Sequence, residues 1–71
     1  MKYKLLEIKK VEIMSVVHIQ YQDYGGVWVT VQTVDNEPVR VLDAMRSLKT
    51  SMPDRRVRAV DDAGRLVDFF G

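Results

Sequence analysis

Few residues of this chain have the side chains and spacing that catalysis or metal binding requires. His18 is the only histidine and there is no cysteine, so the ligand sets that usually hold a metal are missing. No serine stands in a nucleophile-elbow motif or beside a base. Asp61-Asp62 is a carboxylate pair, but aspartates favour turns because they bond nearby backbone amides. Gly25-Gly26 lacks the flanking residues of a phosphate-binding loop. The sequence predicts no enzyme, no cofactor and no metal.

Two groups of residues have chemistry suited to binding. The first combines aromatic, apolar and arginine side chains, a mixture typical of the centres of protein interfaces. Its members are Trp28, Arg58, Leu66 and Phe70, with His18 and Gln20 at the rim. The second is basic, because residues 40–58 hold six cations and two acids, an excess of +4. Its members Arg46, Lys49, Arg55 and Arg56 would gather near a helix C-terminus and would attract a phosphate backbone.

Two β-hairpins are predicted to position the first group. Residues 11–21 and 27–34 alternate apolar and polar side chains, as half-buried strands do. A three-residue loop at 24–26 would pair Tyr21 with Val29 and Ile19 with Val31. Residues 57–70 predict a second hairpin, in which Gly64 supplies the left-handed conformation that its loop needs. The predicted partners are Asp61–Arg65, Val60–Leu66, Ala59–Val67, Arg58–Asp68 and Val57–Phe69.

A helix is predicted between the two hairpins. Asp35 and Asn36 are residue types that cap helices, and Pro38 suits a first turn. The helix should end near Ser51, because Pro53 restricts the residue before it. One apolar stripe at helical spacing would face the sheet; it comprises Val41, Ala44, Met45, Leu48 and Met52.

These elements predict a single α+β domain over residues 1–71, with a four-stranded antiparallel sheet and one helix packed on one face (ββαββ). The covered face should hold Val17, Ile19, Tyr21, Val29, Val31, Val57, Ala59, Val67 and Phe69. The opposite face should carry Val16, His18, Gln20, Trp28, Thr30, Arg58, Val60, Leu66, Asp68 and Phe70. Small monomers rarely leave such an apolar patch exposed. The patch is therefore either an interface or a second small core beneath the N-terminal segment.

Residues 1–10 fit the strand pattern less well, because Tyr3 and Leu5 alternate out of phase with Leu6 and Ile8. We favour a long first strand with a bulge near Lys9-Lys10, and a separate edge strand is the alternative.

Composition narrows the class of protein. A chain of 71 residues buries only about 60% of its unfolded surface, so a partner would add to its stability. Its net charge of +1 is too small to predict nucleic-acid binding by itself. The apolar runs are short and interrupted by charges, which predicts neither a membrane span nor a signal peptide. The absence of cysteine fits a reducing compartment such as the cytoplasm.

The run from Pro53 to Asp68, with Trp28-Val-Thr-Val-Gln upstream, resembles small uncharacterised ββαββ proteins of bacteria, phages and mobile elements. The resemblance covers roughly residues 16–70 and rests on structural motifs. It implies no catalytic residue. It implies a context in which compact proteins without cofactors bind and block a host protein, as anti-CRISPR proteins do.

We therefore expect a non-enzymatic module that binds a protein partner, or a second copy of itself, through the uncovered sheet face or a sheet edge. The alternative is a small nucleic-acid-binding protein that uses the basic cluster. No small-molecule substrate is indicated.

Overall fold

The fold is the predicted ββαββ arrangement. A computed structural model of the chain describes residues 15–70, and the expectations for residues 1–10 lie outside that range. The elements are β1 (Val16–Gln22), β2 (Trp28–Asp35), α2 (Pro38–Ser51), β3 (Val57–Asp61) and β4 (Leu66–Phe70). Of the residues described, none belongs to a helix long and apolar enough to cross a membrane.

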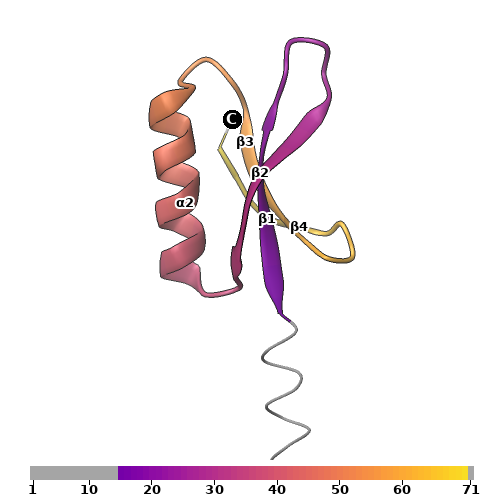
Figure 1. The fold of residues 1–71 in the computed structure, drawn as a ribbon, viewed down its shortest axis with the longest axis vertical. Helices are drawn as coiled ribbons and strands as arrows, with labels where there is room; N and C mark the ends of the chain where they lie inside the picture. The colour runs from indigo at the N-terminus through magenta and orange to yellow at the C-terminus, as the bar shows by residue number, and fades with distance from the viewer. Residues whose placement is uncertain (1–14, 71) are drawn as a thin grey trace, which may run out of the picture.

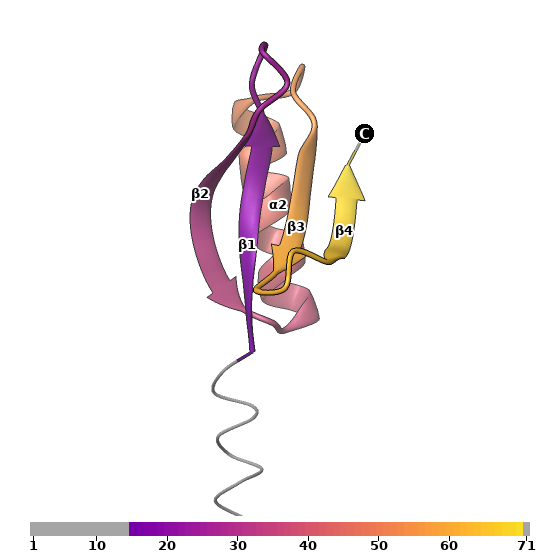
Figure 2. The same cartoon turned by 90° about the vertical axis from the view of Figure 1, so that its right-hand side faces the viewer.

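The four strands form one antiparallel sheet in the order β2-β1-β3-β4. Figure 1 shows α2 along one side of this sheet, and Figure 2 shows the opposite side face-on with α2 behind it. The helix packs against β1, β2 and β3, whereas β4 lies at the edge beyond it (Figure 2). Over residues 15–70, the face turned away from α2 carries no covering element (Figure 1). We call it the open face.

The two hairpins have loops of the same construction. In the first, the Asp23 amide donates to the Val27 carbonyl at 2.8 Å, and Asp23 Oδ1 accepts from the amides of Gly25 and Val27. Gly26, at φ +87°, takes the left-handed position. Both features set a three-residue loop, as predicted, and Tyr21 pairs with Val29.

The second loop repeats this scheme. The Asp61 amide donates to the Arg65 carbonyl at 3.0 Å, and Asp61 Oδ1 accepts from the amides of Ala63 and Arg65. Gly64 has a φ of +81°. The predicted Asp61–Arg65 closure and the Val60–Leu66 pair are therefore confirmed.

One residue of β2 is inserted into the predicted register. Ile19 pairs with Gln32 instead of Val31, because Gln20 pairs with Thr30 and the intervening Val31 forms a bulge. Val31 is consequently 48% exposed, and its assignment to the buried face was wrong. Beyond the bulge, Val34 takes the place facing the core.

A second bulge changes the faces of β4. Val67 is the inserted residue, so Ala59 pairs with Asp68, Arg58 with Phe69 and Val57 with Phe70. The three predicted partners beyond Leu66 were wrong by one residue. Since a shift of one residue reverses the side-chain direction, Phe70 packs against the core and Phe69 moves to the open face beside Arg58.

The helix begins one residue later than the capping prediction. Glu37, not Asp35 or Asn36, is the N-cap residue, and its side chain makes no capping bond. Pro38 opens the first turn as expected. The helix ends at Ser51, and the Met52 amide still donates to the Leu48 carbonyl at 2.9 Å.

The core lies between α2 and the strands behind it. Its buried members are Val17, Ile19, Val41, Met45, Val57 and Ala59, with Val34, Ala44, Leu48 and Phe70 packed against them. Burial of these side chains is the main source of stability in so small a fold. Val67 and Phe69, which we expected in this core, are 41% and 44% exposed.

Candidate functional site

The open face is the candidate site, and its residues lie in two rows across the sheet. Strand pairing determines both rows, since directly paired residues point to the same side. The first row comprises Thr30, Gln20, Arg58 and Phe69, and the second comprises Thr33, His18, Val60 and Leu66. Trp28, the partner of Gln22, lies beside the first row and contacts Arg58. All four strands contribute to each row.

Trp28, Arg58 and Gln20 form one connected group. Arg58 Nε donates to Gln20 Oε1 at 2.7 Å, and the guanidinium carbon lies 4.0 Å from the centre of the Trp28 ring. Gln20 Nε2 in turn donates to Thr30 Oγ1 at 2.9 Å. A cation over an indole gains about 0.5–1 kcal/mol at an exposed site. The contacts therefore hold the arginine in one orientation before any partner arrives.

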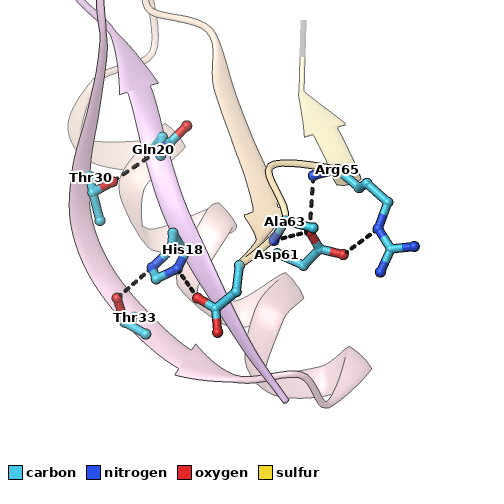
Figure 3. A network of polar contacts seen from close by, with 8 residues as sticks. His18, Gln20, Thr30, Thr33, Asp61, Ala63 and Arg65 are labelled. Carbon is cyan, nitrogen blue, oxygen red and sulfur yellow. Dashed lines mark hydrogen bonds and ion pairs between the residues drawn. The ribbon is translucent and has the colours of Figure 1, made fainter. Parts of the chain in front are cut away.

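His18 belongs to a second polar group on the same face. Its Nδ1 is 2.9 Å from Thr33 Oγ1, and its Nε2 is 2.7 Å from Asp62 Oδ1. Figure 3 shows His18 and Gln20 side by side on β1, with Thr33 and Thr30 on β2. The bulge in β2 brings Thr33 opposite His18, where the predicted register would have Gln32. His18 thus links two strands to the β3–β4 loop.

Threonine, imidazole and carboxylate also occur in this order in hydrolytic sites. Here the hollow of about 270 Å³ beside Asp62 is lined by residues that do not include His18 or Thr33. Its lining is Ser15, Val16, Asn36, Asp61, Asp62, Ala63 and Arg65. A nucleophile needs a place for substrate beside it, and this hollow does not lie against Thr33. The contacts of His18 attach β1 to β2 and to the β3–β4 loop.

The apolar part of the open face lies toward β4. Leu66 is 61% exposed and Phe69 is 44% exposed, whereas Val60, the neighbour of Leu66 in the second row, is only 6% exposed. The fixed Arg58–Trp28 pair matches the composition of interface hot spots, and Leu66 and Phe69 add exposed apolar area beside it. Polar groups dominate the side of the open face near β2, so the face changes from mainly polar at β2 to mainly apolar at β4.

The structure brings together five of the six residues predicted for this site. Phe70 is the exception, because the bulge at Val67 turns it toward the core. Phe69 takes its place and was missed. No signal in the sequence separates the two, since they are adjacent and chemically identical.

The predicted basic cluster is partly used within the fold. Lys49 Nζ donates to the Arg55 carbonyl at 2.6 Å. The Arg55 guanidinium lies 3.7 Å from the centre of the Tyr24 ring and 5.6 Å from that of Tyr21. Contact with Tyr24 holds the pKa of Arg55 above its usual value. These two cations attach the β1–β2 loop to the turn after α2.

Arg46 and Arg56, by contrast, are exposed. The four predicted phosphate-binding cations therefore do not form one free patch. Among residues 15–70 there is also no group of three or more His, Cys, Asp or Glu side chains that would hold a metal ion.

The chain was compared with protein-family models, with curated proteins and with solved structures. None of the three comparisons finds a match.

Proposed function

We propose that this protein is a non-enzymatic binding module that docks its open face onto a protein partner. The observation that carries the proposal is a sheet face that no element within residues 15–70 covers. On it Arg58, fixed over Trp28, adjoins the exposed Leu66 and Phe69. Trp and Arg are the residues most often found at the energetic centres of interfaces. A sheet face of this composition gains stability when it is covered.

Two features favour the face over the β4 edge as the docking surface. The bulge at Val67 interrupts the regular spacing of backbone groups along β4. The Phe69 amide donates a hydrogen bond to Asp68 Oδ1 at 2.8 Å. Bulges and charges on an edge strand both oppose pairing with a further strand. A second copy of the chain remains a candidate partner, through its face.

The proposed biological role follows from the resemblance to small proteins of phages and mobile elements. Such a module would act as an inhibitor or modulator of a host protein. A cytoplasmic location would fit a chain that has no cysteine. Its small core suits this role, since binding to a partner adds stability to a marginal domain.

The test compares two equally exposed apolar residues. Leu66 on the open face and Val39 on α2 are 61% and 66% exposed. Each is replaced by glutamate in the full chain, which is used to capture proteins from the native host for identification by mass spectrometry. We expect Leu66→Glu and Trp28→Ala to lose the protein that wild type and Val39→Glu retain.

Circular dichroism and light scattering accompany the capture. Retained helix signal in Leu66→Glu and Trp28→Ala separates lost binding from unfolding, and light scattering reports a second copy as the partner. If both open-face variants retain the captured protein, or only Val39→Glu loses it, the open face is not the docking surface.

Nucleic-acid binding is the second candidate, and the exposure of Arg46 and Arg56 is the observation in its favour. A mobility-shift titration at two salt concentrations tests it, because counterion release makes phosphate binding salt-dependent. Under this alternative, Arg46→Gln with Arg56→Gln weakens binding at low salt. Absence of a shift at either concentration removes the candidate.

A further inference from the structure

We infer that the partner segment that docks on the open face carries a carboxylate side chain flanked by apolar side chains. Arg58 binds this carboxylate. This inference rests on the proposed function and specifies the chemistry of the partner. It makes Arg58 the residue that determines which segment is accepted.

Arg58 is placed at the middle of the sheet with its direction already determined. It lies on β3 directly opposite Gln20 of β1, and its Nε bond and its stacking on Trp28 fix one edge and one face of the guanidinium. The rotational entropy that an arginine usually loses on binding is therefore largely lost before the encounter.

Within residues 15–70, the remaining donors of Arg58 are unused. No hydrogen bond or ion pair between residues 15–70 involves either of its Nη groups. Of the nearby acids, Asp62 is engaged with His18, and Asp68 pairs with Ala59, on the other side of the sheet from Arg58. Residues 15–70 thus leave the charge of Arg58 without a neutralising acid.

Covering this face would bury that charge. A buried guanidinium without an acceptor is strongly unfavourable, so a complementary partner must supply oxygen atoms to both Nη groups. A carboxylate does this with two charge-assisted hydrogen bonds in the plane of the guanidinium. Phe69, the direct neighbour of Arg58 on β4, and the exposed Leu66 then require apolar side chains next to the acid.

The same geometry disfavours a nucleic acid on this face. Single-stranded bases bind by stacking on free aromatic rings within a groove of several cations. One face of the Trp28 ring already carries the Arg58 guanidinium. His18, the other basic group of the two rows, is bonded to a carboxylate. A phosphate ligand would find a single available cation here.

A selection from a random peptide-display library tests the inference directly. The full chain is immobilised as wild type, as Arg58→Gln and as Arg46→Gln, the last removing an exposed arginine from α2 instead. We expect wild type and Arg46→Gln to enrich peptides with Asp or Glu next to Leu, Val or Phe. Arg58→Gln should lose the enrichment of acids.

Affinities of a selected peptide are then measured from the fluorescence of Trp28, the only tryptophan. Replacing its acid by the amide should weaken binding to wild type about tenfold or more, as expected for a charged hydrogen-bonded pair. The same change should have little effect on Arg58→Gln. A single-stranded oligonucleotide serves as the competing ligand.

Several results would overturn the inference. They are a lack of acid enrichment on wild type, equal enrichment on Arg58→Gln, failure to select any peptide, and displacement of the peptide by the oligonucleotide at lower concentration. Open-face docking would survive the first two results, because it is decided separately by Leu66→Glu and Val39→Glu in the host capture.

Discussion

Asp61 is the residue whose single side chain organises the β3–β4 turn. Its Oδ1 accepts hydrogen bonds from the amides of Ala63 and Arg65, each at 2.9 Å, and its Oδ2 accepts one from Arg65 Nε at 3.0 Å. Figure 3 shows this group apart from the His18 contacts. The backbone bond from Arg65 is the main cause that lowers the pKa of Asp61 below its ordinary value.

That lowered pKa makes the stability of the fold depend on pH in a defined direction. The contribution of Asp61 is fully present above its unfolded pKa of about 3.9 and is lost as the pH falls through the lower folded pKa. Asp61→Asn cannot ionise, so its free energy of unfolding should fall less steeply with acid than that of wild type. Denaturant unfolding at a series of acidic pH values measures this. Asp43→Asn, an exposed change on α2, should keep the wild-type slope, and an unchanged slope in Asp61→Asn would contradict the assignment.

Arg55 has a comparable role at the other loop, although it was assigned to a binding patch. Its stacking on Tyr24, and the Tyr24 hydroxyl that donates to Asp54 Oδ2 at 2.9 Å, attach the first hairpin to the end of α2. Its Nε is buried without a hydrogen-bond partner among the described residues. Arg55, which the sequence suggests is available to bind phosphate, thus has a structural role in the fold.

At the scale of elements, the sequence predicted strands, helix and loops, because each has a local cause. Alternation marks the strands, Pro38 and Pro53 bound the helix, and Gly26 and Gly64 take the only left-handed positions in residues 15–70. The bulges have weaker local causes. In β2 there was a signal, since Val29 and Val31 have one parity and Val34 the other. In β4 there was none, because Leu66–Phe70 has apolar residues at both parities.

The bulge in β4 makes the two adjacent phenylalanines unequal, which mutation can test. Phe70 packs against the core, whereas Phe69 is 44% exposed. Phe70→Ala should lower the free energy of unfolding by about 2–3 kcal/mol, at or below the usual range for a buried Phe because it is only partly buried. Phe69→Ala should lower it by less than about 1 kcal/mol. Denaturant titration of both variants measures the difference. The reverse order would support the unbulged register and return Phe70 to the open face.

The whole molecule is asymmetric, because the four-stranded sheet is wider than the one helix that packs on it. α2 covers β1, β2 and β3 and leaves β4 beyond its edge (Figure 2). The hollow of about 340 Å³ between the start of α2 and β4 is lined by Pro38, Val41, Leu42 and Val67 together with Asn36 and Asp68. Apolar side chains are therefore exposed on both sides of β4, an edge strand to which another chain could be added.

The Asp68 carboxylate opposes that addition together with the bulge at Val67, and its removal should change the association state. The Phe69 amide donates a hydrogen bond to Asp68 Oδ1 at 2.8 Å, so it already has an acceptor without a further strand. The charge of Asp68 would also be buried if β4 paired with a second β4. Asp68→Ala frees the amide and removes the charge. We expect its mass by light scattering to rise with concentration well above that of wild type, while Asp43→Ala matches wild type.

Adding Leu66→Glu to Asp68→Ala separates the two routes of association. Pairing at the edge should largely persist in the double variant because it uses backbone groups, whereas contact through the open face should be lost. If Asp68→Ala has the mass of wild type at every concentration, the bulge alone protects this edge and the carboxylate does not.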